Sequence, residues 1–220
     1  MTGASINQLL FFKGLASTSS LNAALIVVTI PVFVFLISLF LKKEKIEIKK
    51  IIGLVIGLLG SSMIILNSST NQNQVDSSSG DFYVVANSIL FASYFIIVKP
   101  LSHNYPALFI AFWMFFFGSI ISFPISLNAI VAINWSLMNP KAYIILFSLI
   151  VIVTAAGYIV NTWALKYANA TNVSFYIFTQ PFFTAICALI FLKKEISYIK
   201  IICAGFIFLG VYLVNKKKTT

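Results

Sequence analysis

The chain of 220 residues is 60% hydrophobic and 15% aromatic, and only 9% of its residues are charged. Soluble globular domains carry about 25% charged and about 45–50% apolar residues, so this composition, with a mean hydropathy of +1.00, excludes a soluble fold and predicts an integral membrane protein. The net charge of +10 comes from fifteen lysines against five acidic residues. Because the lysines cluster between apolar runs, they indicate the cytoplasmic membrane face rather than a nucleic-acid site.

Seven apolar runs approach the length of a transmembrane helix, which needs roughly 20 mostly apolar residues. The segment before the first run has one brief apolar patch and is too short to span alone. The second and seventh runs are short, so we expect them to cross nearly upright or to include flanking lysine stems. In chain order the predicted spans are Leu21–Leu41, Ile51–Leu66, Phe82–Val98, Ala107–Ser126, Ala142–Leu165, Val173–Leu192 and Ile199–Val214.

The connectors between these spans predict the orientation. Asn67–Asp81 is polar and free of lysine, and it is the expected boundary between two halves. Lys99–Pro106 is the expected loop after the third span, and it contains His103. With seven spans, ten lysines fall on one side of the membrane and five on the other. The positive-inside rule then places the C-terminus in the cytoplasm of a bacterial-type inner membrane and the N-terminus outside.

One string of residues occurs twice. TIPVFVFLISLFLKKEK begins at Thr29 and TQPFFTAICALIFLKKE begins at Thr179, and both contain Thr-x-Pro, an apolar run and Phe-Leu-Lys-Lys-Glu. Pro31 and Pro181 are 150 positions apart. Because five spans separate equivalent positions, the second copy is predicted to be inverted in the membrane relative to the first. Inverted repeats of this kind are typical of transporters that alternate access around a midplane site.

The number of residues that precede the repeated string differs between the two copies. About 99 residues lie between Phe82 and Pro181, whereas only 30 precede Pro31. Roughly 70 residues, or two to three spans at about 20–25 residues each, therefore have no counterpart in the first copy. We expect the first repeat to be incomplete on its N-terminal side.

The two copies resemble the EamA repeat of the drug/metabolite transporter superfamily. That repeat has an Ala-Leu-x-Tyr-like turn, a span with a mid-helix proline, an acidic residue at its end and a short glycine-bearing span. The two prolines match, Glu44 and Glu195 match the acid, and Trp163-Ala-Leu-Lys-Tyr167 matches the turn. The family usually has glycine before the acid, where this chain has lysine. The resemblance implies ten spans, in two repeats of five spans each, whereas seven spans are predicted here.

This resemblance implies an all-α membrane protein with four segments. Residues 1–67 would be the C-terminal part of a first EamA-like repeat and 68–81 a polar linker. Residues 82–215 would be a second EamA-like repeat of five helices, and 216–220 a basic cytoplasmic tail.

The predicted spans contain no Asp, Glu, Arg or His. This argues against a metal site, a Ser-His-Asp site and a carboxylate proton relay through these spans. We therefore expect no enzyme activity, no cofactor and no metal. Cys187 and Cys203 lie in apolar runs and are predicted to be buried small hydrophobes rather than a disulfide.

The remaining candidates for function are prolines, amides, hydroxyls and aromatic rings. A proline inside a span removes a backbone donor, which indicates either a structural kink or a broken helix that lines a cavity. Amides in hydrocarbon must be hydrogen-bonded, so they should point inward, either into a cavity or toward a neighbouring helix. The candidate cavity residues are Thr29, Pro31, Tyr94, Tyr158, Asn161, Tyr176, Gln180 and Pro181.

Four glycines are expected in helix packing: Gly53 and Gly57 form Gly-x-x-x-Gly, and Gly60 has its counterpart in Gly210. The contact is expected within the monomer, with a dimer contact as the alternative. Trp113 and the run Phe115–Phe117 are predicted to face lipid or neighbouring helices, with an aromatic cage for an organic cation as the alternative.

The leading hypothesis is an EamA-like secondary transporter that moves a small metabolite or drug-like solute by alternating access. The alternative is a truncated, non-transporting membrane fragment or a subunit whose partner supplies the missing helices. The expected partners are membrane lipid and a small-molecule solute, with a homodimer as a further option and no nucleic acid.

Overall fold

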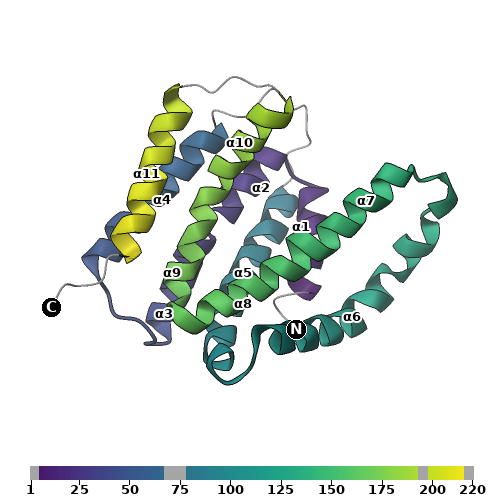
Figure 1. The fold of residues 1–220 in the computed structure, drawn as a ribbon, viewed down its shortest axis with the longest axis horizontal. Coiled ribbons are helices and arrows are strands. Elements are labelled where there is room, and N and C mark those ends of the chain that lie inside the picture. Colours follow the sequence, from purple (N-terminus) through teal and green to yellow (C-terminus); the bar gives the residue numbers. More distant parts are fainter. Residues whose placement is uncertain (1–4, 67–77, 193–197, 216–220) are drawn as a thin grey trace.

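The computed structural model describes residues 5–66, 78–192 and 198–215, and these residues form helices without any strand (Figure 1). The elements in chain order are α1 (Asn7–Leu15), α2 (Ser20–Val27), α3 (Ile30–Phe40), α4 (Ile48–Leu66), α5 (Ser78–Asn104), α6 (Ala107–Ala132), η2 (Trp135–Leu137), α7 (Pro140–Ser148), the π-helix η3 (Leu149–Ala156), α8 (Gly157–Tyr167), α9 (Ala170–Ser174), the 3₁₀ helix η4 (Phe175–Thr179), α10 (Gln180–Leu192) and α11 (Tyr198–Asn215).

Five helical segments are long and apolar enough to cross a membrane, and they confirm the first five predicted spans. The sixth predicted span is divided among α9, η4 and α10, and the seventh is α11. The five long segments are Ser20–Phe40, Ile48–Leu66, Ser78–Asn104, Ala107–Ala132 and Pro140–Tyr167.

The third span is longer at both ends than predicted. Helix α5 begins at Ser78, so Asp81 lies in its first turn, where a carboxylate is favourable. At the other end α5 continues through Pro100 to Asn104, so the expected loop is mostly helical and His103 lies in the last turn. A proline leaves the carbonyl four residues earlier without its usual donor. In this helix that carbonyl belongs to Ile96, and the Lys43 ammonium donates to it at 3.4 Å.

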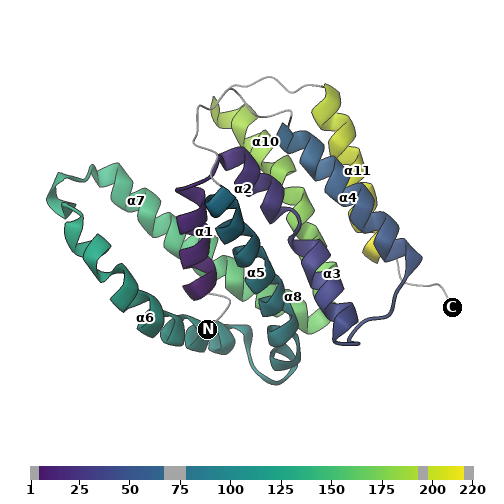
Figure 2. The same ribbon diagram turned by 180° about the vertical axis from the view of Figure 1, so that it is seen from behind.

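Two buried clusters hold the bundle together. One lies around α5 and includes Val34, Phe95 and Leu165, and the other lies between α4, η4 and α11 and includes Phe178 and Ile207. Helix α5 packs against α1, α3 and α8 near the middle of the bundle (Figure 2). Helices α6 and α7 diverge from it, and none of the described residues of α7 and η3 is buried.

The two cysteines behave differently. Both are free, but only Cys203 is buried, whereas Cys187 is exposed on α10. The prediction that both are buried was therefore wrong for Cys187. Apolar composition marks a residue for hydrocarbon or for the protein interior, and it does not distinguish the two.

Helices α4 and α11 cross at their glycines. A Cβ atom at Gly53 would lie 2.7 Å from the carbonyl oxygen of Gly210, and a Cβ at Gly60 would lie 2.9 Å from that of Cys203. Gly53, the earlier of the two α4 glycines, thus meets Gly210, the later of the two α11 residues. The two helices are therefore antiparallel. Adding 150 to Gly53 and Gly60 gives Cys203 and Gly210, so each contact is the image of the other. Such reciprocity is what an inverted repeat predicts.

Gly57 lies between these two contacts. Its Cβ would lie 2.7 Å from the Phe178 ring, which is fully buried. The structure therefore brings Gly53, Gly57, Gly60 and Gly210 into one interface of the chain with itself.

Candidate functional site

Both Thr-x-Pro strings lie where regular α-helix is interrupted, by a turn in the first copy and by a 3₁₀ helix in the second. Helix α2 ends at Val27 and α3 starts at Ile30, while η4 ends at Thr179 and α10 follows it. The Thr29 hydroxyl donates to the Ile26 carbonyl at 2.6 Å, and the Thr179 hydroxyl donates to the Tyr176 carbonyl at 2.6 Å. Each threonine thereby satisfies a carbonyl of the preceding turn beside the break.

The prolines themselves occupy positions that tolerate them. Pro31 and Pro181 lie in the first turn of α3 and α10, where a missing N–H leaves no intrahelical bond unmade. Both side chains are buried. Each proline thus begins a helix without the loss of a backbone hydrogen bond.

The centre of the bundle contains a network of tyrosine, threonine and asparagine. The Tyr94 and Thr162 hydroxyls lie 2.9 Å apart, and the Tyr94 ring contacts the Tyr158 ring at 5.3 Å between centroids. Asn7 and Asn87 exchange reciprocal bonds, with each side-chain amide donating to the other's backbone carbonyl at 3.0 and 2.8 Å. These buried polar groups tie α1, α5 and α8 together, as buried polar groups require partners.

The other amide and tyrosine candidates lie outside this network. Asn161 is half-buried on α8, while Gln180 and Tyr176 are exposed. The structure therefore brings Tyr94 and Tyr158 together and leaves Asn161, Gln180 and Tyr176 apart from them. Their assignment to a cavity stays a prediction.

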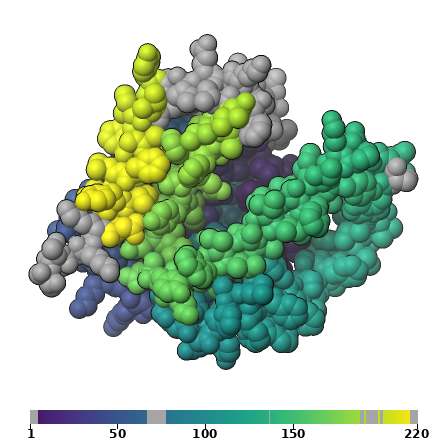
Figure 3. Space-filling model, viewed as in Figure 1, coloured from purple at the N-terminus to yellow at the C-terminus, as the bar shows by residue number. Residues whose placement is uncertain are grey.

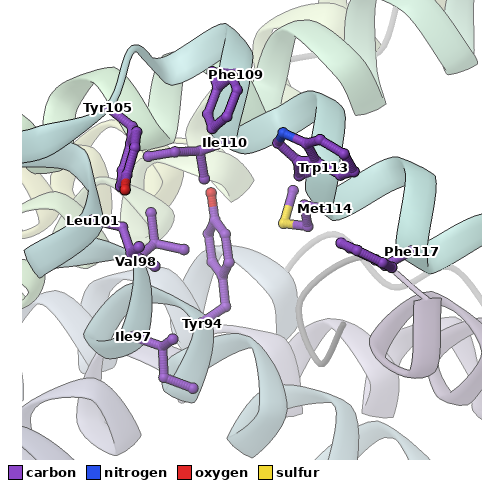
Figure 4. Close-up of a pocket in the computed structure, with 10 residues that line it drawn as sticks. All are labelled: Tyr94, Ile97, Val98, Leu101, Tyr105, Phe109, Ile110, Trp113, Met114 and Phe117. Carbon is purple, nitrogen blue, oxygen red and sulfur yellow. The ribbon is translucent and has the colours of Figure 1, made fainter.

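A cavity of about 250 Å³ adjoins Tyr94, between the C-terminal half of α5 and the N-terminal half of α6. In Figure 4 the Tyr94 ring stands between Val98 and Met114, with its hydroxyl toward Ile110. The lining is apolar and aromatic, which is typical of small-molecule sites. The ten lining residues are Tyr94, Ile97, Val98, Leu101, Tyr105, Phe109, Ile110, Trp113, Met114 and Phe117.

A second polar cluster closes the end of the bundle that carries Glu44. Helix α3 ends in a turn in which Lys42 adopts a φ of 53° and the Lys43 N–H donates to the Ser38 carbonyl at 2.9 Å. This is the arrangement of a Schellman cap, with lysine in place of the usual glycine. The turn reverses the chain so that Glu44 lies against the bundle instead of projecting beyond it.

The Glu44 carboxylate joins elements from both halves of the chain. Its Oε2 accepts from the Lys50 ammonium at 2.6 Å, and its Oε1 accepts from the Thr171 hydroxyl at 2.8 Å. The side chains of Lys50 and Glu44 are only 8% and 6% exposed. The Thr171 N–H also donates to Glu44 at 3.3 Å, at the N-terminus of α9. An anion there is favoured by the unpaired N–H groups of the helix.

Comparison with known proteins identifies the family. The model of the EamA-like transporter family matches residues 1–66 and 78–216. The chain belongs to the EamA-like transporter family. An uncharacterized transporter of Archaeoglobus fulgidus is 25% identical over 218 residues, covering 99% of this chain and 74% of the relative. The uncharacterized transporter YetK of Bacillus subtilis is 24% identical over 225 residues, and the match covers 99% of this chain and 66% of YetK.

The fold has a close counterpart among solved structures. A crystal structure with 13% sequence identity matches with a TM-score of 0.76, covering 95% of this chain and 71% of the other. At this identity the likeness concerns the fold alone. Family and relatives together make this chain a multi-pass membrane protein and a transporter of the drug/metabolite type.

Sequence reasoning missed most of the Glu44 cluster in this EamA protein. It identified Glu44 only as the acid that ends a span, counted Lys50 and Lys99 only among the lysines that set the orientation, and assigned no role to Thr171. Lys99 donates to the carbonyls of Leu165 and Ala168 at 2.6 and 2.8 Å, at the C-terminus of α8. A lysine at the end of one apolar helix and a helix start at Asn169-Ala-Thr were the available signals. Glu195, the counterpart of Glu44, lies outside the described residues.

The central network gives a first testable prediction for this EamA protein. Tyr94→Phe removes the hydroxyl that bonds Thr162, so the free energy of unfolding should fall by about 1 kcal/mol. Thermal unfolding in detergent, followed by circular dichroism, measures the change. Tyr143→Phe is the matched control, because its hydroxyl bonds the Trp135 carbonyl at the surface and should matter less. Equal losses in the two variants would contradict a special role for the buried hydroxyl.

Proposed function

We propose that this EamA protein moves a small organic solute across the membrane by alternating access. The observation that carries the proposal is the pair of helix breaks, each with the same threonine hydrogen bond, together with the reciprocal α4–α11 contact. In transporters with inverted repeats, broken helices line the site and the two halves rock around it. Pro31 and Pro181 would be the joints of that motion.

The two ends of the bundle differ in a way that supports this mechanism. At one end Glu44, Lys50 and Thr171 join α3, α4 and α9. Toward the opposite end α7 diverges from α10, and Figure 3 shows the surface hollowed between α7–α8 and α9–α10. The proposed state is therefore closed at the Glu44 end and open at the other. Opening the closed end would require the Glu44 bonds to break.

The lysine distribution supports the proposed orientation. Lys43, Lys50 and Lys99 all lie at the Glu44 end, where their ammonium groups bond Ile96, Glu44 and Leu165. By the positive-inside rule this end, and with it the C-terminus, would face the cytoplasm. The proposed location is the inner membrane, and the proposed conformer is outward-open.

One observation favours a second candidate, a subunit that transports only with a partner. The faces of α7 and η3 carry no buried residue among those described, although this segment belongs to a candidate span. A homodimer contact or a second helical protein would cover such a face in a bilayer.

Transport assays separate the two candidates. The purified chain is reconstituted into liposomes, and uptake of radiolabelled amino acids, nucleosides and organic cations is compared with empty vesicles. We expect at least one class to enter about fivefold faster or more, which corresponds to about 1 kcal/mol in the barrier. Uptake that rises in proportion to protein density supports a self-sufficient unit. Uptake that is absent across the panel, or that appears only with a co-reconstituted membrane extract, contradicts it.

A further inference from the structure

Helix α6 and the residue before it carry one row of aromatic rings spaced four residues apart. Tyr105 stacks on Phe109 at 5.4 Å between centroids, and Trp113 stacks on Phe117 at 5.5 Å, with Phe109 edge-on to Trp113 at 6.2 Å. Residues four apart lie on one helical face. All four rings line the cavity beside Tyr94 and are 39–48% exposed, so part of each ring is available to an occupant.

The opposite wall is formed by α5, and it carries a single hydroxyl. Tyr94 contributes that hydroxyl, which lies 2.9 Å from the Thr162 hydroxyl and 3.4 Å from the Tyr158 carbonyl oxygen. Ile97, Val98 and Leu101 complete the wall. None of the ten lining residues is charged.

We propose that the cavity between α5 and α6 binds an uncharged aromatic solute of one or two rings. The proposal rests on the transport function above and names the class of solute that enters it. The aromatic rings on one wall offer stacked and edge-on contacts to a flat ring, and the apolar side chains of the opposite wall complete an uncharged lining.

Size and charge both restrict the solute. Drug-sized ligands occupy pockets of roughly 300–1,000 Å³, so a cavity of about 250 Å³ matches a smaller molecule best. A buried anion would lack a cationic partner among the lining residues, and a buried cation would lack a carboxylate. Ring faces alone attract cations, so an organic cation is the competing occupant that the experiment must separate.

The aromatic row also differs from an ordinary lipid-facing surface. Phe112 and Phe116 lie on the same helix, stack on each other at 6.1 Å and do not line the cavity. They provide controls of the same residue type on the same helix. A lipid tail would contact both sets of rings without discrimination.

Trp113 makes the test direct, because its indole lines the cavity. Trp135 and Trp163 are changed to phenylalanine in the full chain, and emission is recorded in detergent while nitrobenzene is added as an uncharged, quenching aromatic probe. We expect saturable quenching. Phe109→Leu should raise the half-saturating concentration about two- to twelvefold, the range set by one aromatic pair. Phe112→Leu should leave it unchanged.

Four results would overturn the assignment. They are quenching that rises linearly without saturation, an equal effect of Phe112→Leu, competition by cyclohexanol as strong as by benzyl alcohol, and displacement by tetraphenylphosphonium stronger than by benzyl alcohol. The last two would indicate a general apolar groove and a cation site, respectively. If the tryptophan-reduced chain does not fold, equilibrium dialysis of radiolabelled nitrobenzene against the unmodified chain gives the same comparison.

Binding and transport can fail separately. Saturable, Phe109-dependent binding without uptake in liposomes would retain the site and reject the transport mechanism. Uptake of other solutes without saturable aromatic binding would retain the mechanism and reject the site.

Discussion

Gly210→Ala is expected to lower the free energy of unfolding by about 2 kcal/mol. A Cβ at this position would lie 2.7 Å from the Gly53 carbonyl oxygen and 3.0 Å from the Gly57 nitrogen, so backbone rather than a flexible side chain is in the way. Overpacking of this kind costs about 1–3 kcal/mol, and we expect the upper end because neither helix can give way locally. The better helix propensity of alanine offsets about 1 kcal/mol of that cost.

Gly205→Ala is the matched control in the same helix. No atom lies within 4 Å of a Cβ built there, so only the helix-propensity gain of about 1 kcal/mol remains. Thermal unfolding of both variants in the same detergent should therefore separate them by about 3 kcal/mol. If the two variants melt together, the close approach of α4 and α11 is not what stabilises this half.

Glu44→Gln is expected to have an effect of similar size at the Glu44 end of the bundle. The variant leaves the Lys50 ammonium with the Glu47 carboxylate, 3.9 Å away, as its remaining charged partner. Removing one member of a buried ion pair costs about 3–5 kcal/mol. We expect a loss near 3 kcal/mol because Glu47 supplies part of the missing charge.

Two further variants test the origin of that loss. Glu47→Gln should cost less than about 1 kcal/mol, because the Glu47 side chain is 42% exposed. The double variant Glu44→Gln with Lys50→Met should recover much of the stability, since an apolar pair can replace a buried ion pair. Lys50→Met is measured alone for comparison. If the double variant loses as much stability as Glu44→Gln and Lys50→Met lose together, Glu44 and Lys50 do not interact.

The spans could be predicted from sequence because each depends on composition within about 20 neighbouring residues. The Thr-x-Pro breaks could also be predicted, since the motif acts on its own turn and occurs twice. Thr29 and Thr179 make the same bond because their local sequences are alike.

The candidate site was much harder to predict from sequence. The bond between Glu44 and Thr171 joins residues 127 positions apart, and the Tyr94–Thr162 bond joins residues 68 apart. Such pairings depend on how helices are rotated and placed, which local periodicity does not determine. The same limit explains why the end of α5 was misplaced. Pro100 is a usual sign of a helix end, whereas here the distant Lys43 donates to the Ile96 carbonyl that the proline leaves without its helical donor.

The reciprocal contact of α4 with α11 has the form of an isologous interface, in which residue i meets j and j meets i. Between identical chains, any substitution at such an interface acts twice and changes both contacts equally. In this chain the two positions are encoded separately, and Gly53 of one copy corresponds to Cys203 of the other. The strength of packing at Gly53 and at Gly60 can therefore diverge. A single chain can thus give its two equivalent contacts unequal energies, which a symmetric pair of identical subunits cannot do.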